Sequence, residues 1–363
     1  MEPLHRVIEF FEKSFSSSFA LPEDRGGLQI QAKNTVEKIL VALELNPKVF
    51  KKATDQNYDF LYLHHPPLWE PLQKLSCDDP LFVMLEGLYS RGISVLAHHT
   101  NLDVLEGGIA DQWVKLLELE GSTRPLVPLT HLKKYKIVTF VPPSHLEEVL
   151  QALFEQGAGI IGNYRECAFL LSGTGTFLPG EKAYPFIGTP GCRERVEEVR
   201  VEVEVESPYL ERAVKALIRA HPYEEPVVDV YPLHVLSRVG IGRVVTLATP
   251  LPWKILEERL SRLGVPHTLI GSREDKSFAK IALCPGSGRG VMSQVLQGRP
   301  DLFVSGDLTH HDIETLNLYG IAHVNLPHSE GERRALREIT GSLKEKAKQE
   351  NLNVEITFEE EKL

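Results

Sequence analysis

Seven of the 14 histidines in this 363-residue chain gather where four apolar segments end. The segments are "DFLYL", "SVLA", "DLFVSG" and "AHVNLP", and each reads as a short buried strand that runs into polar residues. The histidines and the acids beside them are His64, His65, His98, His99, Asp103, Asp307, His310, His311, His328 and Glu332. Imidazole and carboxylate groups suit Zn, Fe or Mn ions. The pattern therefore predicts a metal site.

The number of donors exceeds what one tetrahedral ion needs. Two divalent ions, Zn, Fe or Mn, lying about 3.5–4 Å apart and sharing a carboxylate, would use them all. His328 and Glu332 stand four positions apart, so a helix that begins here would project both side chains from one face. The sequence favours a dinuclear centre over a single ion.

Each motif taken alone has a plainer interpretation. A pair of adjacent histidines is most often structural or a helix cap, and "HHTNLD" could be an Asx-turn that leads into a helix. "GDLTHHD" could be only a helix start capped by Thr309. The coincidence of four such strand ends is what favours the metal site.

Strands alternating with amphipathic helices predict an α/β domain with a mainly parallel sheet, whose sites lie at the carboxyl ends of strands. This domain is expected to be split into residues 1–125 and 236–363. Residues 126–235 show a different pattern of predicted elements, two strand–helix units followed by a final strand. They resemble a ferredoxin-like α+β module. Within this insert, residues 172–191 are rich in glycine and proline, which predicts a long loop.

The segment "CPGSGRG" at 284–290 follows a predicted strand and precedes a predicted helix. Such a loop can turn backbone N–H groups toward an anion, so Gly286, Ser287 and Gly288 are candidate phosphate-binding residues. A tight strand-to-helix turn is an equally open interpretation. Cys284 is expected to be a small buried residue, because no base is identifiable beside it.

Bulk composition excludes several classes of protein. A net charge of -10 argues against a nucleic-acid or membrane-surface binder, both of which need a basic face. Four scattered cysteines favour a reducing compartment over a disulfide framework. The N-terminal segment reads as an amphipathic helix without signal-peptide features, and no apolar stretch is long enough to cross a bilayer. We expect a cytoplasmic protein.

The motifs "HHPPLW", "AHHTNLD", "CPGSGRG", "SGDLTHHD" and "HSEGERRAL" stand in the order that the Nif-three-like family of dinuclear-metal-centre proteins has. The chain resembles that family, many of whose members are named GTP cyclohydrolase I type 2 homologues. The resemblance implies two ions held by His64, His65, Asp103, His328 and Glu332, with Glu332 as the bridge.

The resemblance has further implications. His99 falls on the family's single histidine, whereas the family often has Glu where Asp307 stands. His310 and His311 would line the pocket as acid–base groups. Family members assemble as a hexameric ring, which implies a homo-oligomer here. The insert, with "GAGIIGNYRECAF" and "AHPYEEPVVDVYPL", resembles the PII and CutA type of ferredoxin-like domain.

Two functions follow from these observations. The first is a metal-dependent hydrolase of the GTP cyclohydrolase type, acting on a nucleotide or related phosphate-bearing substrate. His310 or His311 would then transfer protons, and the glycine loop would bind phosphates. The alternative is a non-catalytic metal-binding or regulatory protein whose PII-like insert senses a small molecule or a partner. Nucleic-acid binding is a third and weaker hypothesis, because the chain has no basic stripe.

Overall fold

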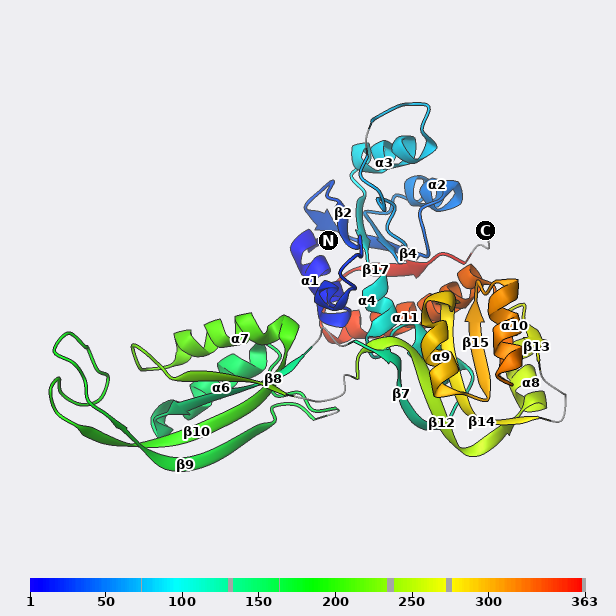
Figure 1. Cartoon of the computed structure of the whole chain (residues 1–363). Coiled ribbons are helices and arrows are strands. Elements are labelled where there is room, and N and C mark those ends of the chain that lie inside the picture. Colours follow the sequence, from blue (N-terminus) through cyan, green and yellow to red (C-terminus); the bar gives the residue numbers. More distant parts are fainter. Residues whose placement is uncertain (73, 130–132, 163, 234–237, 272–275, 361–363) are drawn as a thin grey trace. The chain divides into compact units, whose positions relative to one another are not determined.

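The computed structural model describes residues 1–72, 74–129, 133–162, 164–233, 238–271 and 276–360 (Figure 1). The chain forms two compact units. The first combines Met1–Leu129 with Arg238–Leu363, and the second is the inserted segment Thr130–Ser237. Both ends of the chain thus contribute to the first unit, so residues far apart in sequence can share one site there. In the described ranges, no helix has both the length and the apolar character that crossing a bilayer requires.

One sheet of the first unit has five strands in the order β17-β4-β5-β6-β2. The strands are β2 (Gly27–Ile30), β4 (Lys38–Ala42), β5 (Phe60–Leu63), β6 (Ser94–Ala97) and β17 (Glu355–Phe358). All neighbours run parallel except β2, which is antiparallel to β6. Every residue of β5 and β6 is buried. Parallel strands covered on both faces take such continuous apolar sequences.

Helices cover both faces of this sheet. Phe60 and Tyr62 of β5 pack into the main core with α1 (Leu4–Ser14). Leu61 and Leu63, on the opposite face, pack in a second cluster with residues of α2 (Pro47–Asp55) and α3 (Pro80–Ser90). Both α2 and α3 begin at a proline that follows a capping side chain, a favourable helix start. Two-residue strands β1 (Glu2–Pro3) and β3 (Thr35–Val36) pair beside α1.

The other sheet of the first unit has six strands in the order β13-β16-β15-β14-β12-β7. They are β7 (Gly121–Pro128), β12 (Gly240–Pro252), β13 (Thr268–Ile270), β14 (Ser277–Ser287), β15 (Leu302–Gly306) and β16 (Ala322–Asn325). Only β14, β15 and β16 run parallel to one another. The five-stranded sheet is mainly parallel, as expected, but the sequence did not predict this second sheet, in which antiparallel pairs flank the three parallel strands. β7 and β12 are antiparallel because they carry the chain into and out of the insert.

The remaining helices of the first unit connect and cover these sheets. They are α4 (Thr100–Val104), α5 (Ile109–Leu116), α8 (Trp253–Leu263), α9 (Met292–Gly298), α10 (His310–Leu318) and α11 (His328–Gln349), with 3-10 turns η1 (Ser17–Phe19) and η3 (Arg289–Val291). The buried Trp113 of α5 donates its indole N–H to the carbonyl of Gly331 at 2.8 Å. The buried Arg243 of β12 forms two bonds to Asp111 of α5, at 2.6 and 2.8 Å. α5 is thereby fixed to α11 and to the second sheet.

The inserted unit has the element order β-α-β-β-α-β. Its elements are β8 (Lys134–Val141), η2 (Pro143–His145), α6 (Leu146–Glu155), β9 (Ala168–Phe177), β10 (Glu194–Glu206), α7 (Ser207–Ala220) and β11 (Val228–Leu233). The strands form one antiparallel sheet in the order β11-β8-β10-β9. Alternate valines of β10, such as Val201 and Val203, are buried in the core with residues of α6 and α7. The opposite face of β10 carries charged residues.

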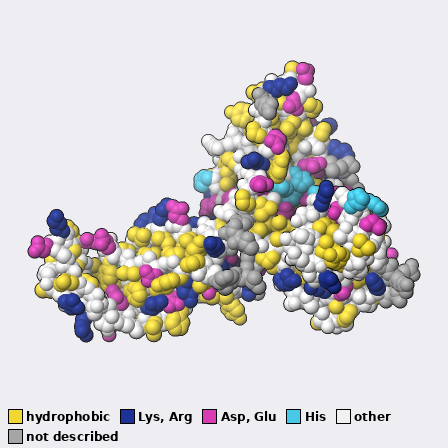
Figure 2. All heavy atoms as spheres, viewed as in Figure 1, with side chains coloured by type: hydrophobic (Ala, Val, Ile, Leu, Met, Phe, Trp, Pro, Cys, Tyr) yellow, Lys and Arg dark blue, Asp and Glu magenta, His cyan; other side chains and the backbone are white. Residues whose placement is uncertain are grey.

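The predicted loop at 172–191 was wrong for its first residues, because β9 continues to Phe177. Gly173 and Gly175 made these residues resemble a loop, because glycine is uncommon inside strands. Both belong to β9, the edge strand that pairs with β10. Residues 178–193 form the connection to β10. Large apolar side chains remain exposed on β9, including Phe169 and Leu171. Figure 2 shows hydrophobic side chains across the visible face of the insert.

Candidate metal centre

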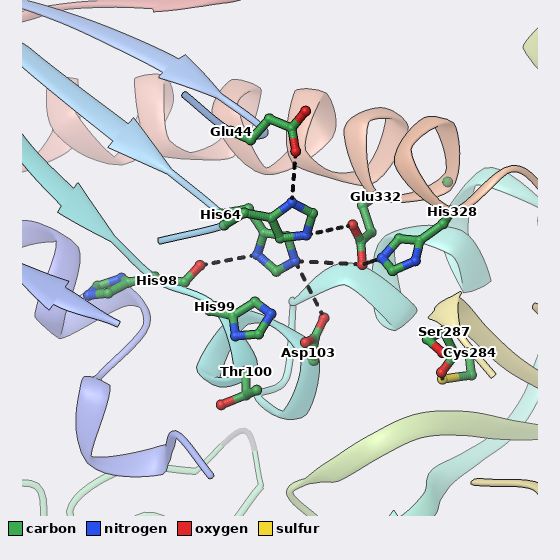
Figure 3. A network of polar contacts seen from close by, with 12 residues as sticks. Glu44, His64, His98, His99, Thr100, Asp103, Cys284, Ser287, His328 and Glu332 are labelled. Carbon is green, nitrogen blue, oxygen red and sulfur yellow. Dashed lines mark hydrogen bonds and ion pairs between the residues drawn. The ribbon is translucent and has the colours of Figure 1, made fainter. Parts of the chain in front are cut away.

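The five predicted ligands come together at the carboxyl ends of strands (Figure 3). His64 and His65 follow directly on β5, and Asp103 lies on α4 just after β6. His328 and Glu332 occupy the first turns of α11, which follows β16 of the other sheet. His64 and His65 stand directly after their strand, and the connections from β6 to α4 and from β16 to α11 are two residues long, so these side chains all lie at this edge. Residues from both outer segments of the chain thus lie together in groups that could hold a metal ion.

The Glu332 carboxylate occupies the middle of the cluster and is only 4% exposed. Its Oε1 lies 2.8 Å from His328 Nε2, and its Oε2 lies 3.0 Å from His65 Nε2. His64 Nε2 is 3.8 Å from both Glu332 Oε1 and Asp103 Oδ1. Two groups of potential ligands result, His65–His328–Glu332 and His64–Asp103–Glu332. Glu332 belongs to both.

The second ring nitrogen of each histidine is held by another group. His64 Nδ1 lies 3.1 Å from the carbonyl of His98, and His328 Nδ1 lies 2.5 Å from Asp307 Oδ2. His65 Nδ1 is 3.5 Å from Glu44 Oε2. A partner at Nδ1 fixes the ring and directs Nε2 to the centre, as in protein metal sites. Asp307 reaches His328 from a left-handed backbone conformation (φ 56°), which aspartate tolerates.

His99 extends the cluster on the side of Asp24. Its ring belongs to a third group of potential ligands with His64 and His65. Its Nδ1 lies 3.3 Å from Asp24 Oδ1, while the backbone N–H of Thr100 donates to Asp24 Oδ2 at 2.7 Å. Burial alone would raise the pKa of Asp24, but these hydrogen bonds hold it well below its usual range. Asp24 is therefore a fixed negative charge behind His99.

Electrostatics in the cluster favour a bound cation. Burial would raise the pKa of Glu332, but contacts with His328, His64 and His65 hold it well below its usual range. The bond to Glu332 raises the pKa of His328 to about 9. Burial lowers the pKa of His65, yet Glu332 and Glu44 outweigh it and raise that pKa to about 9. Without metal, the protons on His65 and His328 offset the negative charge of the carboxylates. Divalent ions in the same place could supply that positive charge instead.

Two observations test whether metal ions fit these residues. First, His64 Nε2 is fully buried and has no hydrogen-bond partner, although it points at two carboxylates 3.8 Å away. That separation is too long for a hydrogen bond but suits two donors of one ion. Second, the donors are nitrogen and oxygen atoms, which suit Zn, Fe or Mn. The residues fit divalent ions.

A cavity of about 200 Å³ lies beside the cluster, and Gly286 and Ser287 of the glycine loop line it together with Glu332. β14 ends at Ser287, and a side chain on Gly286 would come within 2.4 Å of Glu332 Oε1. Gly286 therefore makes room for the cluster. The N–H of Gly288 donates to the carbonyl of Gly306 at 3.1 Å, so it is engaged within the protein. Burial raises the pKa of Cys284 to about 12, which keeps its thiol neutral.

Comparisons with known proteins identify the family of this chain. The family described as Duf34/NIF3 (NGG1p interacting factor 3) matches residues 3–362. The GTP cyclohydrolase 1 type 2 homolog of Halalkalibacterium halodurans is 33% identical over 308 residues, covering 84% of this chain and 82% of that protein. The protein of the same name from Bacillus subtilis is 33% identical over 329 residues, covering 89% and 87%. A crystal structure of a Bacillus cereus protein related to NIF3 superposes with a TM-score of 0.85 at 32% identity, covering 99% and 96% of the two chains.

The chain belongs to the Duf34/NIF3 family. The family predicted from the sequence motifs is thereby confirmed. All of those motifs fall within the matched residues, as do the groups of potential ligands that the structure brings together.

His310 and His311 stand apart from the other predicted site residues in this Duf34/NIF3 protein. Both are exposed at the start of α10, and neither lines the cavity beside Glu332. Thr309 caps this helix through a reciprocal capping box with Asp312, which is the plainer interpretation of "GDLTHHD". Their role in proton transfer stays a prediction.

Sequence reasoning missed several groups that support the cluster. Glu44 follows β4 at the same sheet edge, so the strand-end rule that identified His64 could have found it. Asp24 lies in an irregular segment before β2, and no sequence signal connects it to His99. His98 was among the strand-end histidines, but its partners were not foreseen: its ring nitrogens lie 3.2 Å from the Tyr62 hydroxyl and 3.1 Å from Glu12 Oε1. These contacts arise only from the tertiary fold.

Proposed function

We propose that this protein holds two divalent ions, Zn, Fe or Mn, and uses them to hydrolyse a nucleotide or a related phosphate-bearing substrate. The observation that carries the proposal is the buried Glu332 carboxylate, shared by two groups of potential ligands. His65 and His328 would hold one ion, while His64 and Asp103 would hold the other. Glu332 would bridge them. His99 is the remaining nitrogen donor within reach of His64 and His65.

When bound, such a pair of ions supplies Lewis acidity and a water molecule that ionises near neutral pH. The chain's own residues prepare the site for it. Asp307, Glu44 and the carbonyl of His98 fix the three imidazoles. Gly286 leaves the space in front of Glu332 open, and Ser287 lines the same cavity. We infer that a substrate phosphate enters along Gly286, Ser287 and Gly288, although the N–H of Gly288 is already bonded.

The names of the relatives, GTP cyclohydrolase 1 type 2 homolog, suggest a purine nucleotide as the first substrate to test. His310 and His311 lie outside the cavity. The proposal assigns them no step, and their proton-transfer role is a separate prediction. We also infer that the chain forms a homo-oligomer, a hexameric ring by its resemblance to the family, which light scattering of the purified protein would test.

The experiment combines metal analysis with turnover. Metal-loaded protein is incubated with GTP and with a panel of nucleotides and phosphate esters, and His64→Ala and Asp103→Asn are compared with wild type. His267→Gln is a matched control, because His267 lies between α8 and β13, where its Nδ1 contacts the carbonyl of Val265 at 2.9 Å. We expect turnover that both site variants abolish and the control retains. Metal binding without turnover of any substrate would contradict the hydrolase proposal and favour the non-catalytic function.

Two observations favour the alternative function, in which the insert is a sensor. Its β-α-β-β-α-β order and its antiparallel sheet are those of a ferredoxin-like module, so we infer a PII- or CutA-type domain. This unit also has a cavity of its own, lined by aromatic and acidic residues. Deleting the insert should then leave metal content unchanged and remove a regulatory response. Loss of the metal on deletion of the insert would contradict the assignment of metal binding to the first unit and of sensing to the insert.

A further inference from the structure

The inserted unit has a half-open cavity of about 400 Å³ that contains none of the motifs of the metal centre. It lies where the end of β9 and the beginning of β10 meet the segment before β11. Four aromatic rings and three carboxylates line it, whereas no Lys, Arg or His does so among the residues that the structure describes. A pocket of this size and mixed character is typical of a small-molecule site.

The aromatic rings surround a common space. The Tyr223 ring lies 6.3 Å from that of Phe177 and 6.4 Å from that of Phe186, measured between centroids, and both pairs are tilted. Phe140 of β8 contributes a further ring to the lining. The faces of aromatic rings carry partial negative charge, so several rings around one space attract a cation.

A carboxylate is positioned beside these rings. The Tyr223 hydroxyl donates to Glu198 Oε1 at 2.8 Å, which leaves Oε2 of the same group for another partner. Burial and the charge of Glu198 raise the pKa of Tyr223, so the phenol remains a neutral donor. A side chain on Gly175 would come within 2.0 Å of Glu198 Oε2. The glycine of the neighbouring strand is what permits the carboxylate to lie here.

The outer wall of the cavity is held in place by hydrogen bonds. The connection between β9 and β10 is closed by a bond from the N–H of Gly191 to the carbonyl of Pro179 at 2.9 Å. The N–H of Tyr184 donates to Glu224 Oε2 at 2.8 Å, which attaches this connection to the segment before β11. Glu225, the next residue, also lines the cavity. Residues 178–193 thus form a fixed wall, with Phe186 on its inner side.

We propose that this cavity binds a small organic cation with an apolar body, of the quaternary or alkylated ammonium class. The rings of Phe177, Phe186 and Tyr223 would surround the cationic head, and Glu198 would neutralise it. Carboxylates and aromatic faces together disfavour an anion, so a nucleotide phosphate does not suit this cavity. The site goes beyond the proposed hydrolysis and does not depend on it.

Calorimetric titration of the full-length, metal-loaded protein tests the proposal. The probes are choline, its neutral isostere 3,3-dimethylbutan-1-ol, and benzyltrimethylammonium, which adds an apolar ring. We expect choline to bind about tenfold more tightly than the isostere, and benzyltrimethylammonium to bind more tightly still. Equal affinity for choline and its isostere, or no binding of either cation, would overturn the proposal.

Variants locate the site. Glu198→Gln and Phe186→Ala are each expected to weaken cation binding at least about fivefold. Gly175→Ala keeps every charge but displaces the Glu198 carboxylate, so it should weaken binding similarly, with circular dichroism reporting the fold. Glu211→Gln on exposed α7 and Tyr164→Ala are the matched acidic and aromatic controls, which should bind as wild type. Unchanged binding in the first two variants would also overturn the proposal.

His64→Ala separates this site from the metal centre. Cation binding should persist in this variant even when its metal content and turnover are lost. Failure of the hydrolase proposal and failure of the cation site would therefore be seen in different measurements.

Discussion

The metal centre and the cavity of the insert use opposite means to prepare for a ligand. In the metal centre, buried Glu332 has imidazoles on two sides, and each imidazole is fixed from behind by another polar group. In the insert, half-exposed rings such as Phe186 surround a space, and one carboxylate is placed beside them. The comparison teaches that single substitutions should abolish binding in the first region and only weaken it in the second.

Glu332→Gln should have the largest effect. It replaces the carboxylate that both groups of potential ligands share, so we expect metal content to fall from about two ions per chain to less than half of that. Mass spectrometric metal analysis after dialysis measures it, with Glu330→Gln on the same helix as the control. A fully loaded Glu332→Gln protein would remove the main contrast between the two regions.

The pH dependence of metal affinity sharpens the contrast further. His65 and His328, whose pKa values are raised to about 9 without metal, must release protons before they can act as ligands. Apparent affinity should therefore rise with pH, by up to about tenfold per unit for each histidine, and level off above about pH 9. Competition with a chelator measures it. A metal affinity that does not change between pH 6 and 9 would contradict the protonation of His65 and His328. Choline binding to the insert should barely change over this range.

Arg243→Met tests whether the two regions are independent. Arg243 is 2% exposed and donates to the part-buried Asp111 carboxylate and to the carbonyls of Gly240, Gly242 and Leu105, so the variant removes a buried charged donor from several acceptors and should cost about 3–5 kcal/mol of unfolding free energy in the first unit. Urea unfolding of the metal-free protein measures it, with the exposed Arg262→Met as control. A cost below about 1 kcal/mol would contradict this reading. Choline binding by the folded variant should equal that of wild type.

Asp307→Asn should have the smallest effect of this series. The substitution keeps the size of the side chain but removes the charge that fixes His328 Nδ1 at 2.5 Å. Loss of such a supporting group is expected to weaken metal binding about 10–100-fold without abolishing it. Glu314→Gln on exposed α10 is the control, and the same chelator competition is the measurement. An unchanged affinity would mean that packing alone orients His328.

The sequence predicted which side chains cluster at the candidate metal site better than it predicted the fold around them. Side chains after buried strands, such as His64 and Asp103, must meet at the carboxyl edge of a parallel sheet, so short-range patterns sufficed for them. The i, i+4 spacing of His328 and Glu332 anticipated a helix, which begins at His328. Glu44 obeys the same strand-end rule and was overlooked. Asp24 follows no such rule, because only the tertiary fold brings its irregular segment beside His99.

Other features of the fold could not be predicted from short stretches of the sequence. The division into two mixed sheets depends on which strands become neighbours, and alternation of strands and helices does not determine it. The glycines of β9 resemble loop residues until the pairing with β10 is known. The cavity of the insert was not anticipated either, because Phe186 and Tyr223 meet across a connection whose path periodicity does not specify.

Anomalous diffraction from crystals of the metal-loaded protein tests the central claim most directly. Data collected on either side of the absorption edge of the bound metal would locate each ion and identify its element. The account predicts two peaks that flank the Glu332 carboxylate, one beside His65 and His328 and the other beside His64 and Asp103. A single peak away from Glu332, or none within reach of these imidazoles, would contradict it.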